Sequence, residues 1–182
     1  GAYDQHVHPA QDVVARKMDD MELAKSYVDA GMKGMAIKAH YFNTAGRAYH
    51  VSQMFPGFRA VGCVVLNNSM GGLNPYAVRQ AGMLGTKLVY MPTMDAQNMW
   101  DYLASSNAAI PFGASSKSSS EVKAIRVYEN GKLAEPVDEI LDLIEEYDMA
   151  LCTGHIAPEE SLALLRRAHE KGLKKLVATH VD

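Results

Sequence analysis

At residues 31–36 the chain reads Gly31-Met32-Lys33-Gly34-Met35-Ala36, and this stretch decides the fold because it joins a helix pattern to an apolar strand pattern. The same joint returns at residues 172–177 as Gly172-Leu173-Lys174-Lys175-Leu176-Val177, and more weakly at residues 85–89 as Gly85-Thr86-Lys87-Leu88-Val89. A glycine that stops a helix and is soon followed by an apolar run is typical of the step from a helix to a buried strand. The repeated joint therefore predicts an α/β chain built from β-α units around a parallel sheet.

Six short apolar runs, most of them ending in polar residues, indicate the strands of this sheet. They cover residues 3–8, 35–40, 58–67, 87–93, 149–156 and 175–180. Because the connections are short, we expect the strands to lie in the sheet in sequence order, with the sheet curved as part of a barrel.

Four of the segments between the strands carry helix start signals. These signals are Asp19 or Asp20, Asn74-Pro75, Pro136 and Pro158. The first helix should run to about Ala30, with Gly31 as its stop. In the helix after Pro158 we expect Leu162, Leu165 and Ala168 to face the core.

One connection, from residue 94 to residue 135, is longer than the others. It contains an apolar patch around Trp100, a serine-rich run at residues 115–120 and a final part at residues 125–133. The final part predicts a β-hairpin, because Asn130-Gly131 is a favoured two-residue turn. Long insertions after a strand of a β/α protein often cover the active face, and we expect this insertion to do so in part. An idle flexible loop is the alternative for the serine-rich run.

The composition is that of one globular domain spanning residues 1–182. Hydrophobic residues make up 48%, charged residues 21%, and the formal net charge is -3, so neither a nucleic-acid surface nor a polybasic membrane patch is expected. No apolar run approaches the roughly 20 residues of a membrane span. The first strand pattern begins almost at Gly1, so no signal peptide is expected. Cys63 and Cys152 are interpreted as buried thiols, which favours the cytoplasm, and a homo-oligomer is compatible with the sequence.

Seven histidines carry the functional signal, and five of them stand at or near the carboxyl ends of predicted strands. These five are His6, His8, His40, His155 and His180. The other two, His50 and His169, fall in helix patterns and are expected on the surface. In a parallel barrel the catalytic groups come from the carboxyl ends of the strands, and residues i and i+2 of a strand point the same way. Asp4, His6 and His8 should therefore project together from the first strand.

A lone histidine at a strand end usually makes an ordinary hydrogen bond, whereas four of them on three strands favour a metal site. Neutral imidazole binds zinc and similar ions at about 2.0–2.1 Å. We therefore predict that His6, His8, His155 and His180 converge on one or two divalent ions. Zinc is preferred, and manganese or nickel is compatible with nitrogen-rich ligation.

The segment Asp4-Gln5-His6-Val7-His8 resembles the H-x-H signature of the amidohydrolase superfamily. His155 and His180, which end the fifth and sixth strands, match the further histidine ligands of that family. Three more segments resemble a group of uncharacterised bacterial hydrolases within it, at residues 34–44, 71–75 and 153–160. The resemblance covers most of the chain and implies a (β/α)8 barrel of the TIM type with metal-dependent hydrolase activity.

The resemblance also implies a bridging carboxylate on the fourth strand, either a carboxylated lysine or a glutamate, and here the chain departs from the family. Lys87 stands at the wrong end of that strand, whereas Asp95 lies just past it and could reach a metal. Lys38, beside His40 at the end of the second strand, could carry a carbamate or hold a substrate carboxylate as a cation. An ion pair with a neighbouring acid is the alternative for Lys38. Lys38, His40 and Asp95 are the predicted catalytic residues.

The family further implies a metal-binding aspartate at the end of an eighth strand. About 200 residues or more are typical of an eight-stranded barrel, and this chain stops at Asp182, just after its sixth predicted strand. We therefore expect about six β/α units of a barrel that is incomplete at its C-terminus, with a different open sheet as the alternative. Asp182 is a poor substitute for the missing aspartate.

The predicted reaction is the hydrolysis of a small molecule. A metal ion lowers the pKa of its bound water to about 7, and a nearby carboxylate would accept the proton. Nothing in the sequence selects among an amide, a lactone, an ester and a phosphoester. One alternative is a phosphoesterase of the histidinol-phosphatase type, for which Arg16, Lys17, Lys38 and Arg47 near the presumed mouth would supply phosphate contacts. The other is a barrel that binds a small molecule and has lost its metal.

Overall fold

The structure, a computed structural model, describes residues 1–106 and 123–181, and parallel strands form its main sheet. In sheet order these strands are β1 (Tyr3–Val7), β2 (Gly34–Ile37), β3 (Arg59–Val65), β4 (Leu88–Tyr90), β7 (Ala150–Cys152) and β8 (Leu176–Val177). The predicted sequence order and parallel pairing are confirmed. Each strand ends earlier than predicted, because the polar residues at its carboxyl end leave the ladder and form the loops above the sheet.

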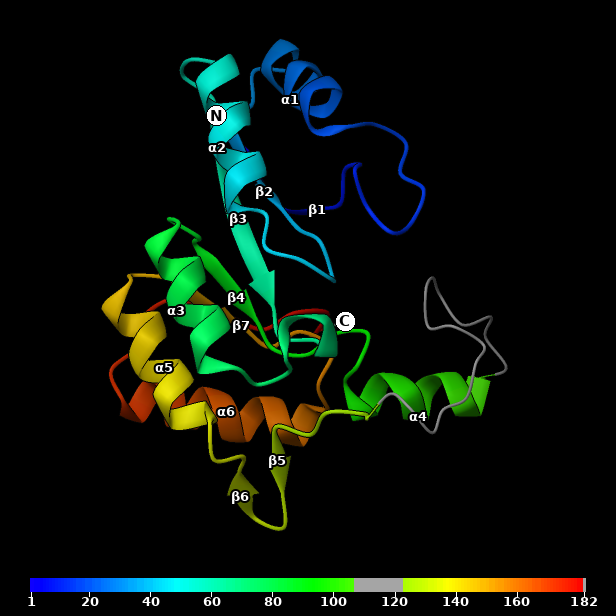
Figure 1. Cartoon of the computed structure of the whole chain (residues 1–182), viewed down its shortest axis with the longest axis vertical. Coiled ribbons are helices and arrows are strands. Elements are labelled where there is room, and N and C mark those ends of the chain that lie inside the picture. Colours follow the sequence, from blue (N-terminus) through cyan, green and yellow to red (C-terminus); the bar gives the residue numbers. More distant parts are fainter. Residues whose placement is uncertain (107–122, 182) are drawn as a thin grey trace.

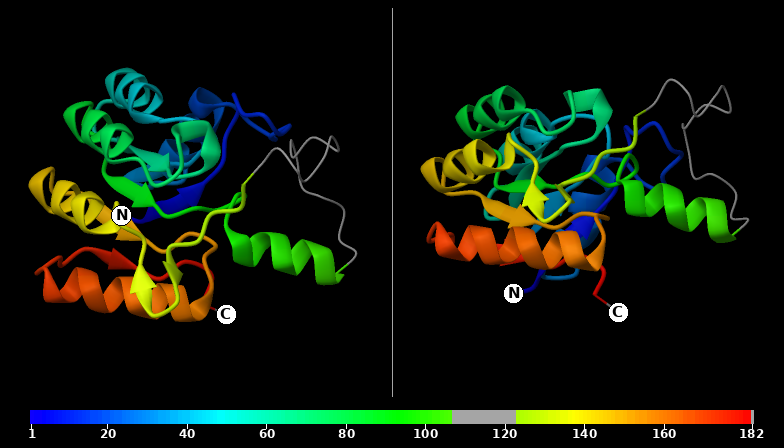
Figure 2. Two further views of the ribbon diagram at one scale, coloured as in Figure 1. Left: turned by 60° about the horizontal axis from the view of Figure 1, so that its bottom comes forward. Right: turned by 90° about the horizontal axis from the view of Figure 1, so that it is seen from below.

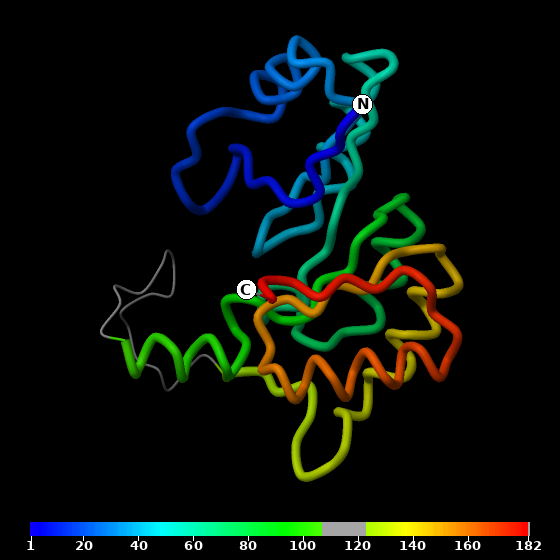
Figure 3. Tube along the Cα trace, turned by 180° about the vertical axis from the view of Figure 1, so that it is seen from behind, coloured from blue at the N-terminus to red at the C-terminus, as the bar shows by residue number. Residues whose placement is uncertain are grey.

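Helices pack on one face of this sheet. They are α1 (Asp20–Asp29), α2 (Ala45–Met54), α3 (Pro75–Met83), α5 (Val137–Glu146) and α6 (Pro158–Glu170), with a 3-10 helix, η1 (Asn68–Met70), before α3. Figures 1 and 3 show α1 and α2 beside β1, β2 and β3, and the later helices beside the remaining strands.

The predicted helix starts are confirmed, and one predicted core residue is wrong. Asp19 accepts hydrogen bonds from two first-turn amides of α1, and Asn74 Oδ1 accepts one from the Tyr76 amide of α3. In α6, however, Leu162 is 56% exposed. Glu160 and Leu164 take the inner face instead, because the Glu160 carboxylate accepts hydrogen bonds from backbone amides of the segment that leads into β5.

Side chains on the two faces of the sheet form different clusters. On the outer face, the largest cluster joins the sheet to α3, α5 and α6 and includes Val64, Val89 and Leu151, and a second cluster joins Met35 and Ile37 of β2 to α1 and α2. The smallest cluster, on the inner face, consists of Cys63, Val65, Tyr90 and Cys152. Both thiols are free and buried, as expected from the sequence.

The sheet is curled, so that its two edges approach each other at the carboxyl ends of the strands (Figure 2). In a flat sheet, five strand spacings of about 4.8 Å would separate β1 from β8 by about 24 Å. In the structure, the rings of His6 from β1 and His180 from the loop after β8 have centroids 5.3 Å apart. Residues from both edges can therefore contribute to one site.

The long connection after β4 begins with α4 (Gln97–Ser106), which projects from the body of the molecule in Figures 1 and 2. The sequence indicated only an apolar patch there. The serine-rich run at residues 115–120 lies outside the described residues, as does Asp182. The predicted hairpin is confirmed as antiparallel β5 (Tyr128–Glu129) and β6 (Lys132–Leu133). Its turn residues Asn130 and Gly131 both have positive φ, as a two-residue hairpin turn requires.

Among the helices within residues 1–106 and 123–181, none combines the length and the apolar character needed to cross a membrane.

Candidate metal centre

The first two histidines of the site come from β1 and the residue that follows it. Their Nε2 atoms lie 3.2 Å apart. Asp4 does not join them, which corrects the prediction that all three side chains project together. Its carboxylate accepts hydrogen bonds from the Tyr27 hydroxyl of α1 at 2.5 Å and from the His6 amide at 2.9 Å. The pairing register of β1 shifts between Asp4 and Val7, and this interrupts the simple alternation of side chains.

His40 stands on the loop after β2 and is held by two polar residues that the sequence analysis did not single out. Its Nδ1 lies 2.8 Å from Thr93 Oγ1. Asn67 Nδ2 donates to Thr93 Oγ1 and to the His40 carbonyl, each at 2.9 Å. Asn67 and Thr93 are polar residues at the ends of buried strand patterns, and that is the signal that could have found them. With Nδ1 engaged, Nε2 is the nitrogen that His40 can offer to the pocket.

His155 follows Gly154, whose backbone conformation requires glycine. Gly154 has φ +67, and a Cβ atom there would lie 2.4 Å from the Met91 carbonyl oxygen. The His155 amide donates to the Pro92 carbonyl at 3.0 Å, and Asn98 Nδ2 donates to the His155 carbonyl at 3.1 Å. The end of β4 thus fixes the backbone that carries His155.

His180 follows β8 and is tied to the His155 loop by two threonines. The Thr179 amide donates to Thr153 Oγ1 at 2.9 Å, and the Gly154 amide lies 3.3 Å from Thr179 Oγ1. His180 itself is exposed and has φ 53. The two loops therefore position His155 and His180 as a pair.

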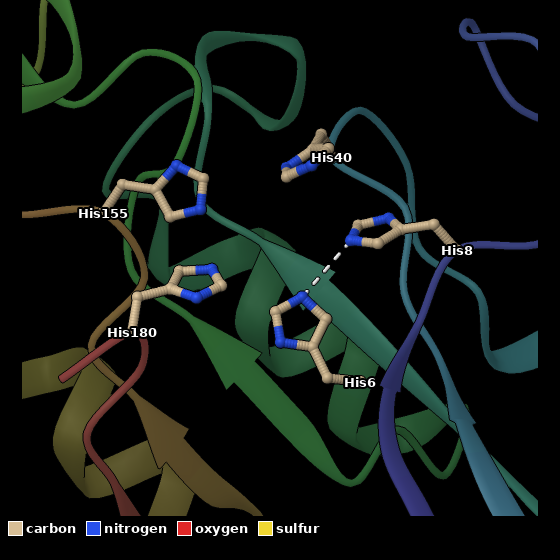
Figure 4. A pocket seen from close by; sticks show the side chains of 5 residues that line it. All are labelled: His6, His8, His40, His155 and His180. Carbon is tan, nitrogen blue, oxygen red and sulfur yellow. Dashed lines mark hydrogen bonds between the residues drawn. The ribbon is translucent and has the colours of Figure 1, made fainter. Parts of the chain in front are cut away.

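The five strand-end histidines form a closed ring around one pocket (Figure 4). Going round from His6 through His8, His40, His155 and His180, neighbouring ring centroids are separated by 5.2, 4.7, 5.8, 5.2 and 5.3 Å. The pocket has a volume of about 420 Å³. His50 and His169 are exposed on their helices, as predicted.

Four of these imidazoles are neutral at neutral pH. Burial, followed by the positive charge of Lys38, lowers the pKa of His6 to about 4, of His8 and His155 to about 3, and of His40 to about 2. Neutral imidazole is the form that binds metal ions.

Lys38 is buried beside His6 and does not line the pocket. It is 1% exposed, with its Nζ 3.1 Å from His6 Nε2 and 4.1 Å from the ring centroid of Tyr90. Burial lowers the pKa of Lys38 to about 8. No carboxylate of residues 1–106 or 123–181 forms an ion pair with it, so the described residues give no support to the alternative of a simple ion pair.

The structure does not bring Asp95 into the lining of the pocket. Its carboxylate accepts a hydrogen bond of 2.7 Å from the Asn68 amide, at the start of η1. Lys87 lies at the opposite end of β4, where its Nζ is 3.5 Å from the Asp148 carbonyl oxygen.

The donors of this pocket fit a divalent ion in kind. Imidazole nitrogens are common ligands of zinc. Two buried ones, His8 Nδ1 and His155 Nδ1, have no hydrogen-bond partner within the described part of the chain. Two nitrogens bound at 2.0–2.1 Å to one tetrahedral ion lie about 3.3–3.4 Å apart, which is close to the 3.2 Å between the Nε2 atoms of His6 and His8.

The ring of five histidines is wider than a set of imidazoles bound to one metal ion would be. A regular pentagon of this size has its centre about 4.5 Å from each ring centroid, whereas an ion bound to imidazole lies about 3.3 Å from the centroid. In keeping with this, no three metal-binding side chains of the described residues are gathered closely enough to hold an ion as they stand. The rings would have to move inward by about 1 Å to share one central ion.

The family described as "Family of unknown function (DUF6282)" matches residues 1–182, and the chain belongs to that family. No curated protein matches the chain.

Proposed function

We propose that this chain is a metal-dependent hydrolase of the amidohydrolase type, with His6, His8, His155 and His180 as ligands of one or two divalent ions. The observation that carries the proposal is the closed ring of imidazoles, to which β1, β2, β7 and β8 or the loops after them contribute. A buried polar atom without a partner costs about 1–3 kcal/mol. One such nitrogen, His155 Nδ1, can be completed by an ion in the pocket, to which His8 would offer its Nε2.

Zinc is the ion that this donor set favours. All ring donors are imidazole nitrogens, which suit zinc and nickel, whereas manganese prefers more oxygen ligands. When bound, the ion would make hydroxide available near neutral pH and polarise the group under attack.

His40 is placed beside the ligands rather than among them. Its ring stacks on that of His8 with an interplanar angle of 21°. An ion bound by imidazole lies near the plane of the ring, so two stacked, nearly parallel rings are poorly arranged to share one ion. His40 Nε2 is instead available to contact the substrate, and Thr93 sets the orientation of the ring.

The position of Lys38 favours one of its two predicted roles. A buried amine cannot readily hold a substrate carboxylate, but it can add CO2. Formation of the N–C bond would give a carbamate and release one proton, and the new carboxylate would supply the oxygen donors that the ring lacks. Asp95 does not line the pocket, and its side chain would have to turn toward it before it could accept a proton there.

The proposal includes a finer fold assignment, in which the curled sheet is six β/α units of a (β/α)8 barrel with its site at the carboxyl ends of the strands. A pocket of about 420 Å³ suits a small-molecule substrate. The buried free thiols of Cys63 and Cys152 suit the cytoplasm.

The test compares the double variant His6→Ala/His8→Ala with the control His50→Ala/His169→Ala, in which both histidines are exposed helix residues. Zinc content by mass spectrometry and zinc affinity by calorimetry should fall in the first variant and stay at the wild-type level in the control. Circular dichroism should show that both variants are folded. Wild-type zinc content in the folded His6→Ala/His8→Ala protein would overturn the proposal.

A substrate panel then separates the alternatives. Zinc-dependent hydrolysis of amides, lactones or carboxylic esters supports the proposal. Hydrolysis confined to phosphomonoesters would favour the histidinol-phosphatase type, and a wild-type protein without metal or hydrolysis would be a small-molecule-binding barrel.

A further inference from the structure

The loop at residues 9–19 follows His8 directly and is fixed in place by Arg47 of α2. The Arg47 guanidinium donates to the carbonyls of residues 9–11 at 2.9–3.0 Å and to both carboxylate oxygens of Asp20 at 2.6 and 2.7 Å. The loop is closed by a hydrogen bond of 2.8 Å from the Ala10 amide to the Met18 carbonyl. Arg47 thus uses all three of its guanidinium nitrogens to hold the loop and has little capacity to bind a substrate.

Arg16 lies within this loop, and its guanidinium is held in one orientation while not all of its N–H donors are engaged. Its Nε and Nη2 lie 2.8 and 2.6 Å from the same oxygen, Asp12 Oδ2. The Asp12 side chain is completely buried, whereas that of Arg16 is 21% exposed. Nη1 of Arg16 has no partner among residues 1–106 and 123–181. A buried carboxylate therefore holds the guanidinium by one edge and leaves part of its donor fork free.

Arg16 lies on the loop that follows His8, at the carboxyl end of β1, where the ring of histidines stands. Its positive charge contributes to lowering the pKa of His8 and of His40, which follow the neighbouring strands β1 and β2. Among the other cations near the mouth, Lys38 is buried beside His6 and Lys17 is exposed. Arg16 is therefore the cation best placed to meet a substrate at the rim of the pocket.

We propose that Arg16, oriented by Asp12, binds an oxyanion group of the substrate, so that the hydrolase acts on anionic small molecules. The inference rests on the proposed function and narrows its substrate class. A guanidinium fork matches both carboxylate and phosphate oxygens, and these two sources share the chemistry that the site would recognise.

Calorimetric titration with acetate and, separately, with inorganic phosphate tests the proposal on the full chain. Each probe is added to metal-free protein and to zinc-loaded protein freed of excess zinc. Arg16→Met should weaken binding of the preferred probe at least tenfold in both forms. Lys17→Met removes the same charge from the next residue and should leave binding unchanged.

Two further variants guard against loss of folding. Arg16→Met leaves Asp12 buried without a partner, so the double variant Asp12→Asn/Arg16→Met removes both charges and should show the same loss of binding. Arg16→Lys keeps the charge but loses the planar fork, and binding should be intermediate.

The outcomes separate this inference from the proposed function. Equal probe binding by wild type and the folded double variant overturns the Arg16 site even when zinc binds normally. Equal losses in Arg16→Met and Lys17→Met also overturn it, because they would show a general charge effect. Probe binding that depends on Arg16 in a protein that never binds zinc would support the oxyanion site and overturn the metal proposal.

Discussion

Replacement of Lys38 by methionine tests whether this buried amine has a counter-charge in the folded protein. The side chains are similar in length, and methionine has neither the charge nor the donor. In the structure Lys38 is 1% exposed, and burial lowers its pKa from 10.5 to about 8. We expect Lys38→Met to raise the free energy of unfolding of chelator-treated, metal-free protein at pH 7.

The magnitude follows from the two pKa values. A difference of about 2.5 between the unfolded and folded pKa corresponds to about 3 kcal/mol at 1.36 kcal/mol per pKa unit. Because the folded pKa is the lower one, the unfolded chain binds more protons between about pH 8 and 10.5, and the stability of the wild type rises with pH across that window. The contact between Nζ and the Tyr90 ring offsets up to about 2 kcal/mol, so we expect a gain of about 1–3 kcal/mol at pH 7 that vanishes toward pH 10.5.

Urea unfolding of both proteins at pH 7 and pH 10 measures this difference. Lys17→Met is the matched control, because it removes an exposed charge and should change stability by less than about 0.5 kcal/mol. A Lys38→Met protein that is less stable than the wild type at both pH values would refute the reasoning. That result would mean that the Lys38 nitrogen is compensated within the folded, metal-free protein.

Gly154→Ala and Thr93→Val should distinguish residues that the proposed metal site needs from a residue that only orients His40. Gly154→Ala should cost about 2–4 kcal/mol in urea unfolding and abolish zinc binding in calorimetry, because its Cβ would lie 2.4 Å from the Met91 carbonyl oxygen. Gly85→Ala, with a similar φ and open space around the Cβ, should cost about 1 kcal/mol and keep zinc binding, and equal zinc affinity in both variants would contradict the role of Gly154. Thr93→Val should lower hydrolytic activity and cost about 1–3 kcal/mol while zinc content stays constant, because it removes the partner of His40 Nδ1. Recovery of activity in Thr93→Ser is expected, and full activity in Thr93→Val would show that the hydroxyl does not position His40.

The sheet could be predicted from the sequence because its signals are local. A glycine stop followed by an apolar run is a property of a few adjacent residues, and Gly31 and Gly172 both mark such joints. Parallel strands buried on both faces also have few alternative arrangements, so short connections fix their order. The Asn130-Gly131 turn could also be predicted, because a two-residue hairpin turn requires positive φ at both positions and Asn and Gly tolerate it.

The parts of the site that escaped prediction depend on contacts between distant residues. The register shift in β1 turns Asp4 toward Tyr27 of α1, and the residue pattern of the strand does not predict this shift. Lys38, predicted as a catalytic residue near the presumed mouth, is instead buried, with its Nζ 3.1 Å from His6 Nε2. Asp95 does not line the pocket, and its carboxylate accepts a hydrogen bond from the Asn68 amide, which belongs to a different connection.

The curl of the sheet and the candidate metal centre are two aspects of one arrangement. β1 and β8 are the edges of the main sheet, and in the described residues no backbone pairing joins them. At their carboxyl ends the edges are nevertheless brought together by His6 and His180, whose rings are neighbours in the pocket. An ion bound by these two residues would therefore bridge the open sides of the sheet, and its binding free energy would add to the stability of the folded chain as RT ln(1 + [L]/Kd). The same bridge would draw the imidazoles inward by the roughly 1 Å that separates the present ring from a formed site, so that a modest closure of the sheet would complete the ligand set.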